Sequence, residues 1–218
     1  MLQKIGILGG TFNPIHYGHL AAAEEVRDRL KLDQVLFIPS YLPPHKQEDI
    51  PSAAQRQDMA RLAIAGNPHF VLSDIEVERE GRSYSIDTIE ELRRLHPGTE
   101  LYFIIGLDSF LEIQTWKAWE RLLSLCSFVV LSRPGYAFTD LGRIDFMQGA
   151  ESELRSLDQR ELKRAAVATS RGTIVMELIP LYDISSTDIR RRVREKRTIK
   201  YLLPEPVETY IIKNKLYA

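Results

Sequence analysis

Short apolar runs rich in β-branched residues alternate along this chain with segments that have helical spacing. This alternation predicts an α/β fold, because parallel strands need a crossover connection, usually a helix, between them. We expect an open, mainly parallel sheet with helices on both faces. Six segments are predicted to be strands: residues 4–8, 34–39, 70–77, 101–105, 127–131 and 173–178.

Helix signals fill most of the intervals between these runs. Ser52 and Gln55 have capping-box spacing before a helix that Gly66 closes, and apolar residues recur every three positions over 86–95. Residues 39–51 carry four prolines and are expected to form a loop, residues 134–172 are expected to be mostly helical, and residues 204–218 a short helix. We therefore expect one domain over 1–218, with a core over 1–180 and a C-terminal helical part over 181–218.

Composition sets few further limits. The chain has 218 residues, 44% hydrophobic residues and a net charge of −1, so it is long enough for a sizeable core, and nothing suggests nucleic acid as a partner. Residues 5–8 are too short for a signal-peptide core, and no apolar run suits a membrane span. The single cysteine, Cys126, lies in an apolar run, which favours a structural role over a reactive thiol. The expected location is the cytoplasm.

Two glycines, a hydroxyl and two histidines follow the first predicted strand: Gly9, Gly10, Thr11, His16 and His19. In an open parallel sheet the turn after a strand lies at the edge where ligands bind, and a helix start offers unpaired N–H groups to an anion. Histidines three apart share one helix face. This pattern predicts a phosphate site with two imidazoles. The dinucleotide fingerprint and the P-loop are both absent from this turn.

A second group of polar residues covers 184–190. Ser186 or Thr187 is expected to cap a helix, and Asp188 suits the positive end of that helix. Arg190 does not suit the first turn, where a cation costs up to about 1 kcal/mol unless an anion binds there. The sequence therefore favours a second anion-binding helix start over an arginine that extends into solvent.

Both groups resemble known motifs. The stretch from Gly10 to His19 resembles the G-x-F-x-P-x-H-x-G-H signature of the nucleotidyltransferase superfamily, and residues 184–190 resemble its I-S-S-T-x-I-R motif. The resemblance implies a Rossmann-like fold, with His16, His19 and Arg190 as catalytic residues acting on a triphosphate. The residues that it assigns to ATP binding are Gly9, Gly10, Thr11, Phe12, Gly106, Asp108, Ser185, Ser186 and Thr187.

Residues 39–46, 83–88 and 105–108, with Trp116, resemble segments of the bacterial nicotinate mononucleotide adenylyltransferases. The residues that this resemblance assigns to the mononucleotide are Lys46, Tyr84, Ser85, Trp116 and Arg133. An indole can stack on a pyridinium ring, although Trp116 can equally pack beside Trp119. Lys46 can instead be solvated, and Asp108 can cap a helix. Asn13 replaces the usual Asp of the family, and Ser85 replaces a usual Thr.

The implied reaction transfers AMP from ATP to nicotinate mononucleotide, giving deamido-NAD and pyrophosphate in NAD biosynthesis. The attacking phosphate is largely a dianion at pH 7, so no general base is required. Mg²⁺ is expected on the ATP phosphates, with no protein side chain as its ligand. Two alternatives remain: a related enzyme acting on nicotinamide mononucleotide or phosphopantetheine, and a non-catalytic nucleotide-binding regulatory module. The sequence leaves the oligomeric state open, a homodimer included.

Overall fold

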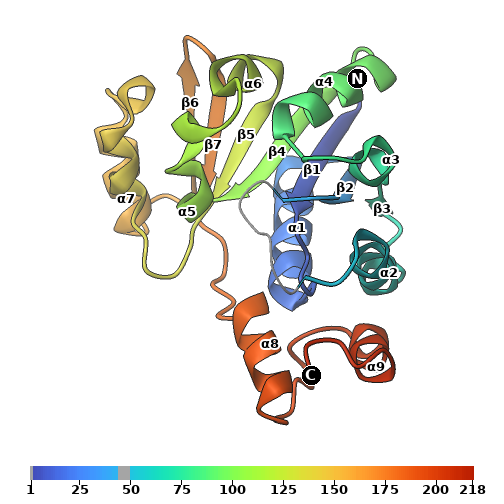
Figure 1. Cartoon of the computed structure of the whole chain (residues 1–218). Helices are drawn as coiled ribbons and strands as arrows, with labels where there is room; N and C mark the ends of the chain where they lie inside the picture. The colour runs from blue at the N-terminus through green and yellow to red at the C-terminus, as the bar shows by residue number, and fades with distance from the viewer. Residues whose placement is uncertain (1, 44–49) are drawn as a thin grey trace.

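The computed structural model describes residues 2–43 and 50–218, within which seven strands form one sheet. Their order across the sheet is β3-β2-β1-β4-β5-β7-β6 (Figure 1). All neighbouring pairs are parallel except β6 and β7, which are antiparallel. The strands are β1 (Lys4–Gly10), β2 (Gln34–Pro39), β3 (Phe70–Leu72), β4 (Glu100–Gly106), β5 (Ser127–Leu131), β6 (Arg164–Thr169) and β7 (Gly172–Glu177).

Helices connect these strands and cover both faces of the sheet. The α-helices are α1 (Tyr17–Leu30), α2 (Ala53–Ile64), α3 (Ile75–Arg79), α4 (Ser85–Leu95), α5 (Leu107–Phe110), α6 (Trp119–Leu125), α7 (Glu151–Asp158), α8 (Ser186–Arg194) and α9 (Glu205–Lys213). Three 3₁₀ turns, η1 (Ile113–Thr115), η2 (Phe138–Arg143) and η3 (Asp145–Met147), complete the described elements. None of the helices that the structure describes is long and apolar enough to cross a bilayer.

The side chains of successive strand residues pack into two different hydrophobic cores. On β4, Phe103 and Ile105 pack with α4, α6 and α7, whereas Ile104 packs with α1, α2, α8 and α9. Because neighbouring residues of a strand point to opposite faces, the two cores lie on opposite sides of the sheet. The expected Rossmann-like arrangement is therefore confirmed.

The strand order reverses between β1 and β4. From β1 the chain proceeds to β2 and β3 on one side, and from β4 to β5 and β7 on the other. A crevice outside the carboxyl ends of the strands forms at such a switch point and commonly binds ligands. The register pairs Ile7 with Phe103, so β1 and β4 end side by side.

Two predicted segments differ from the structure. The strand expected over 70–77 ends at Leu72, and α3 begins at Ile75. Asp74 stands at the N-cap position, and the first turn carries Glu76 and Glu78, which suit the positive end of a helix. Here the local helix signals prevailed over the β-branched residues.

The region expected to be mostly helical, residues 134–172, contains α7 and also the edge strand β6. Alanines make up half of β6, so its sequence lacks the large apolar residues that indicate a strand. Residues of η2, η3 and α7 are buried in the core that also holds Phe128 and Ile174. This region therefore covers one face of the sheet and extends its edge.

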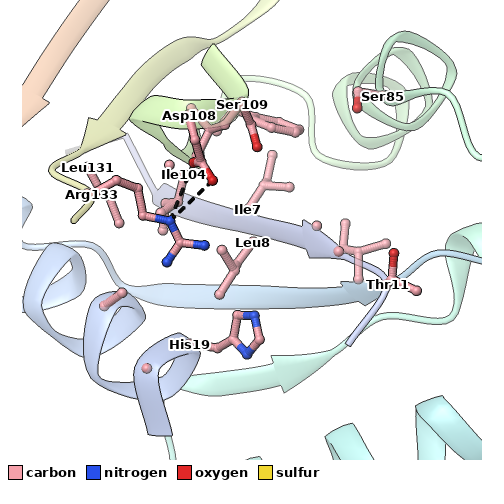
Figure 2. A pocket seen from close by; sticks show the side chains of 18 of the residues that line it. Ile7, Leu8, Thr11, His19, Ser85, Ile104, Asp108, Ser109, Leu131 and Arg133 are labelled. Carbon is pink, nitrogen blue, oxygen red and sulfur yellow. Dashed lines mark hydrogen bonds and ion pairs between the residues drawn. The ribbon is translucent and has the colours of Figure 1, made fainter. Parts of the chain in front are cut away.

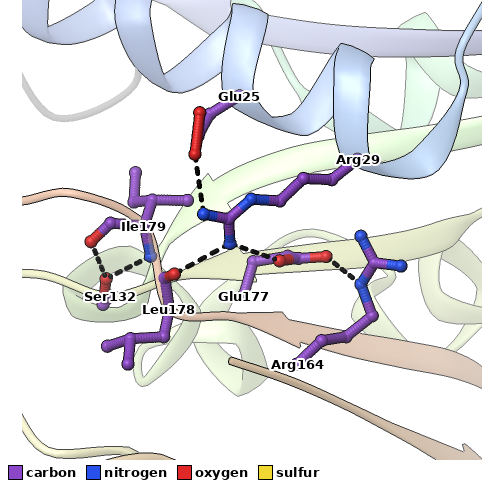
Figure 3. Close-up of polar contacts among 7 residues, drawn as sticks. All are labelled: Glu25, Arg29, Ser132, Arg164, Glu177, Leu178 and Ile179. Carbon is purple, nitrogen blue, oxygen red and sulfur yellow. Dashed lines mark hydrogen bonds and ion pairs between the residues drawn. The ribbon is translucent and has the colours of Figure 1, made fainter. Parts of the chain in front are cut away.

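A buried carboxylate fixes the edge of the sheet to α1 (Figure 3). The Glu177 side chain is fully buried and accepts hydrogen bonds from Arg29 and Arg164. Arg29 Nη1 also donates to the Leu178 carbonyl at 2.9 Å, and Arg29 Nη2 donates to Glu25 at 2.6 Å. One ion-pair network thus joins α1, β6 and β7.

The C-terminal helices pack against the start of the chain. Figure 1 shows α8 and α9 beyond the sheet, near α1 and α2. The Tyr210 hydroxyl donates to Asp58 Oδ2 at 3.0 Å, and the Tyr17 N–H donates to the Leu202 carbonyl at 3.0 Å. These contacts bring the second sequence motif to the first.

Candidate active site

A cavity of about 350 Å³ lies at the switch point, where β1 and β4 end. Its wall includes residues of both strand ends and of the loops that follow β2, β5 and β7. Figure 2 shows Asp108, Arg133 and His19 around this cavity, with Thr11 and Ser85 on another side of it. The predicted site residues that line it are Gly9, Gly10, Thr11, His16, His19, Ser85, Gly106, Asp108, Trp116 and Arg133.

The glycines of the first motif end the strand rather than forming the turn, because β1 continues through Gly10. A Cβ on Gly9 would have no other atom within 4 Å, so the cavity is open at this backbone. A Cβ on Gly10 would lie 3.4 Å from the Phe12 ring. A ligand can therefore approach the main chain at Gly9 without displacing side chains.

The two histidines form a stacked pair at the start of α1. His16 is the N-cap, and its ring centroid lies 3.8 Å from that of His19. The His16 N–H donates to His19 Nδ1 at 3.2 Å. This hydrogen bond makes Nδ1 the acceptor, so a neutral His19 carries its proton on Nε2 and has a donor left for a ligand. A Cβ on Gly18 would lie only 3.0 Å from the His16 ring, which explains the glycine between them.

Both histidines are neutral at pH 7 in this structure. Burial, with a smaller contribution from Arg133, lowers the pKa of His16 to about 4. Burial, His16 and Arg133 together hold the pKa of His19 well below its usual value. An anion bound between these rings and Arg133 would oppose all three effects and favour the protonated form.

Arg133 and Asp108 form the other side of the cavity. Arg133 Nε lies 3.4 Å from both carboxylate oxygens of Asp108, and Figure 2 shows the guanidinium extending from this pair into the cavity. A Cβ on residue 106 would meet Asp108 Oδ1, so a larger residue here would displace this carboxylate. Asp108 is in the first turn of α5 without a side-chain cap, so the capping alternative is wrong.

Unpartnered polar atoms concentrate at the same place. Among the residues that the structure describes, five buried side-chain atoms lack a hydrogen bond, namely Asn13 Oδ1, His16 Nδ1, Ser40 Oγ, Asp108 Oδ1 and Tyr217 Oη. His16, Ser40 and Asp108 line the cavity, and Asn13 lies in the loop before α1. Buried polar atoms are nearly always satisfied, so this grouping indicates a site prepared for a polar ligand.

The wall opposite Arg133 is built from the start of α4 and the segment before α6. Ser85 opens α4, and Trp116 sets its ring edge against Phe103 with centroids 6.1 Å apart. Trp119 stacks on Phe146 instead of packing beside Trp116. The sequence did not single out Glu76, a buried carboxylate in this wall that accepts from Thr88 Oγ1 at 2.7 Å. Residue 76 lies within the segment 70–77, which the sequence predicts to be a strand and not part of a site.

The second motif contacts the first motif from behind the cavity. Ser185 Oγ accepts from the Asp188 N–H at 3.1 Å, so Ser185 caps α8, not Ser186 or Thr187. Ser186 Oγ donates to the Pro14 carbonyl at 2.9 Å, and Arg190 Nη1 donates to the Asn13 carbonyl at 2.7 Å. These bonds fix the main chain of the loop that leads into α1.

Arg190 is the fifth residue of α8, beyond the first turn, so the predicted conflict with the helix dipole does not arise. Several predicted site residues lie outside the cavity wall: Phe12, Tyr84, Ser185, Ser186, Thr187 and Arg190. Phe12 is buried with its ring edge-on to His19, and Tyr84 is the N-cap of α4. Lys46 falls outside the described residues. Direct roles for these residues in binding stay predictions.

The described residues hold no group of three or more His, Cys, Asp or Glu side chains arranged for a metal ion. Cys126 is buried at the end of α6, and burial raises the pKa of its thiol to about 12. This environment agrees with the structural role predicted for it.

Comparison with known proteins places this architecture in a family. The cytidylyltransferase-like family matches residues 7–192. A probable nicotinate-nucleotide adenylyltransferase of Geobacter metallireducens is 48% identical, with 99% of each chain covered. That of Thermoanaerobacter sp. is 46% identical, over 98% of this chain and 94% of the relative.

Solved structures share the fold over nearly the whole chain. Plasmodium falciparum nicotinic acid mononucleotide adenylyltransferase complexed with NaAD has a TM-score of 0.74 at 22% identity, covering 99% of this chain and 97% of that one. The same protein complexed with APC has a TM-score of 0.72. The chain is thus a member of the cytidylyltransferase-like family, together with relatives named nicotinate-nucleotide adenylyltransferases.

Proposed function

We propose that this protein transfers AMP from ATP to nicotinate mononucleotide, giving deamido-NAD and pyrophosphate. Relatives that cover nearly the whole chain at 43–48% identity bear the name of this activity. The single observation that carries the proposal is the stacked pair of neutral histidines beside Arg133, His16 buried and His19 half-buried, in a cavity at the switch point. A bound polyphosphate would place negative charge beside Arg133 and the two histidines, and this would favour protonation of the imidazoles.

In the proposed reaction, a phosphate oxygen of the mononucleotide attacks the α-phosphorus of ATP. A P–O bond forms on one side while the bond to pyrophosphate breaks on the other. The enzyme has to align the two groups and stabilise the charge on the transferring phosphoryl group. His19 Nε2 and the Arg133 guanidinium are the donors that we assign to this charge.

We assign ATP to the side of the cavity formed by Gly9, Gly10, Thr11, Gly106 and Asp108. The Asp108 carboxylate is an acceptor for ribose hydroxyl groups, since Oδ1 has no hydrogen bond of its own. Mg²⁺ would enter as part of the substrate, bound to the ATP phosphates. In this proposal the ion would offset negative charge on the phosphates and would draw no ligand from the protein.

The acceptor would occupy the wall of Ser85 and Trp116. The start of α4 offers main-chain N–H groups and the positive end of a helix dipole, which favour a carboxylate over a carboxamide. The Trp116 indole would stack against the pyridinium ring. This wall therefore predicts a preference for nicotinate mononucleotide over its amide.

The direct test is pyrophosphate release from ATP with nicotinate mononucleotide, nicotinamide mononucleotide and phosphopantetheine in parallel. Nicotinate mononucleotide is expected to give the highest kcat/KM. A higher value with either other acceptor would replace the proposed substrate, and no release with any acceptor would support the non-catalytic alternative.

His19→Ala tests the assignment of the imidazole. Loss of one donor to a developing oxyanion lowers kcat by about 10²–10³-fold. ATP affinity should change much less, because the interaction forms mainly in the transition state. The matched control is His69→Ala, an exposed histidine that contacts the Asp33 carbonyl away from the cavity. Full turnover by His19→Ala would refute the assignment.

A further inference from the structure

Arg56 is an arginine on α2 that neither the sequence motifs nor the proposed mechanism uses. It is 1% exposed, although its side chain carries a full charge. Within the described residues no carboxylate forms an ion pair with it, and burial lowers the pKa of its guanidinium, against a smaller opposing effect of Tyr217 and Glu76. Burying a charge away from water is costly, and hydrogen bonds to the charged group offset part of that cost.

Within the part of the chain that the structure describes, the Arg56 guanidinium donates to three main-chain carbonyls. Nη1 donates to Thr11 at 2.9 Å, Nη2 to Tyr41 at 2.8 Å and Nε to Pro51 at 3.1 Å. These acceptors lie in the first motif, in the segment after β2 and directly before α2. A single side chain thus joins three stretches that are otherwise separate in the sequence.

Two of these stretches connect to parts of the cavity wall that are assigned to different substrates. Thr11 lies in the wall assigned to ATP. The Tyr41 N–H donates to Ser83 Oγ at 2.9 Å, and the Ser83 N–H donates to the Leu42 carbonyl at 3.1 Å. Ser83 lies two residues before Ser85, in the wall assigned to the acceptor. The guanidinium therefore connects the ATP side to the acceptor side.

Arg56 also fixes the direction of a peptide group. The Thr11 carbonyl accepts from Arg56 and the Asn13 carbonyl accepts from Arg190, and neither arginine lines the cavity. Both oxygens are therefore engaged outside the space that a polyphosphate would fill. Carbonyl oxygens turned toward that space would repel the phosphates, so these bonds keep the loop suited to an anion.

We propose that Arg56 is a positioning residue that sets the ATP side and the acceptor side of the cavity at the distance needed for in-line transfer. Arg56 touches neither substrate and acts through Thr11 and Tyr41. The inference rests on the proposed function. It predicts that loss of Arg56 impairs the alignment of two bound substrates more than the binding of either one.

The test measures kcat and both KM values for wild type, Arg56→Met and Arg56→Lys. A displacement of about 1 Å at reacting groups costs about 10²-fold in rate, so Arg56→Met should lose about 10²-fold in kcat. Neither KM should rise more than about 5-fold, because the groups that contact each substrate remain. Arg56→Lys keeps the charge and some of the donors, so it should recover part of the lost kcat.

Arg29→Met is the matched control. Arg29 also makes several hydrogen bonds, but it ties α1 to β7 and reaches no residue of the cavity wall. Its loss should lower the melting temperature and leave kcat within about 2-fold of wild type. If Arg56→Met does not fold, Arg56→Lys decides, with a kcat at least 10-fold below wild type expected from a folded variant.

Three results would overturn the inference. The first is a wild-type kcat in a folded Arg56→Met or Arg56→Lys enzyme, and the second is a KM increase that accounts for the whole loss of kcat/KM. The third is an equal loss of kcat in Arg29→Met. A wild-type enzyme that releases no pyrophosphate with nicotinate mononucleotide overturns the proposed function itself, and the role of Arg56 falls with it.

Discussion

The His16–His19 pair shows how the folded structure suppresses the protonation of single residues at this site. His16 is buried and His19 half-buried, and Arg133 lies close enough to oppose their protonation. In the unfolded chain each histidine would titrate near pH 6.5. The folded protein therefore resists taking up protons that the unfolded chain accepts readily.

This difference predicts a pH-dependent stability. The folded pKa of His16 is about 4, below the unfolded value, so its contribution is complete above about pH 6.5 and is lost as the pH falls toward 4. At pH 4.5 the loss is about 2–3 kcal/mol. Urea unfolding of wild type and His16→Asn at pH 7 and pH 4.5 measures it as the difference between the two pH dependences. Equal pH dependences would contradict the prediction.

Binding of ATP should raise the lowered pKa values of the histidines. A bound triphosphate favours imidazolium, so binding near pH 6 is expected to take up protons from the buffer. Calorimetric titrations in two buffers with different ionisation enthalpies measure the number taken up. In His16→Asn the uptake should shrink, and equal heats in both buffers for wild type would exclude histidine protonation on binding.

Among the elements, α8 depends on its first residues for both its own stability and its contact with the first motif. Ser185 caps the helix, whereas Ser186 uses its hydroxyl on the Pro14 carbonyl. Ser185→Ala should lower the free energy of unfolding by about 1 kcal/mol, as loss of an N-cap does. Thermal unfolding checks this value. Ser124→Ala, where the hydroxyl only donates within α6, should change stability by less than about 0.5 kcal/mol.

The elements also show what the sequence can and cannot predict. The central strands were predicted within two residues at each end, because strands buried on both faces read as continuous apolar runs. The edge strand β6 was missed because Ala165, Ala166 and Ala168 give no such run. Helix α3 was missed because Val71, Ile75 and Val77 resemble strand residues, and only the acidic first turn marks the change.

The candidate site likewise contains some residues that the sequence predicts and others that it does not. His16 and His19 were predicted because their spacing and position suffice, without knowledge of distant contacts. Arg56 and Glu76 were not, because a charged residue on a short helix normally faces solvent. Only the three-dimensional arrangement shows that these two side chains are buried beside the motif loops. The contact of Arg190 with the Asn13 carbonyl depends equally on tertiary structure.

For the whole molecule, the two cores share one sheet, which predicts a single cooperative unit. Truncation after Pro204 removes Val207, Ile211 and Leu216 from one core, each worth about 1.5–3 kcal/mol when buried. Trp116 and Trp119 pack against the other core. In the truncated chain, the fluorescence of these two tryptophans should nevertheless report a melting temperature at least about 10 °C below that of the full chain. An unchanged transition would mean that the faces unfold independently.

The contacts of Ser186 and Arg190 with Pro14 and Asn13 span 172 and 177 residues of sequence. At a synthesis rate of about 5–20 residues per second, the first motif leaves the ribosome roughly 10–30 s before its partners. During that time the nascent chain can pair its central strands, but the loop before α1 lacks the donors that fix its carbonyls. The loop that leads into the candidate site is therefore fixed only near the end of synthesis, and an incomplete chain would lack these contacts even with both histidines already made.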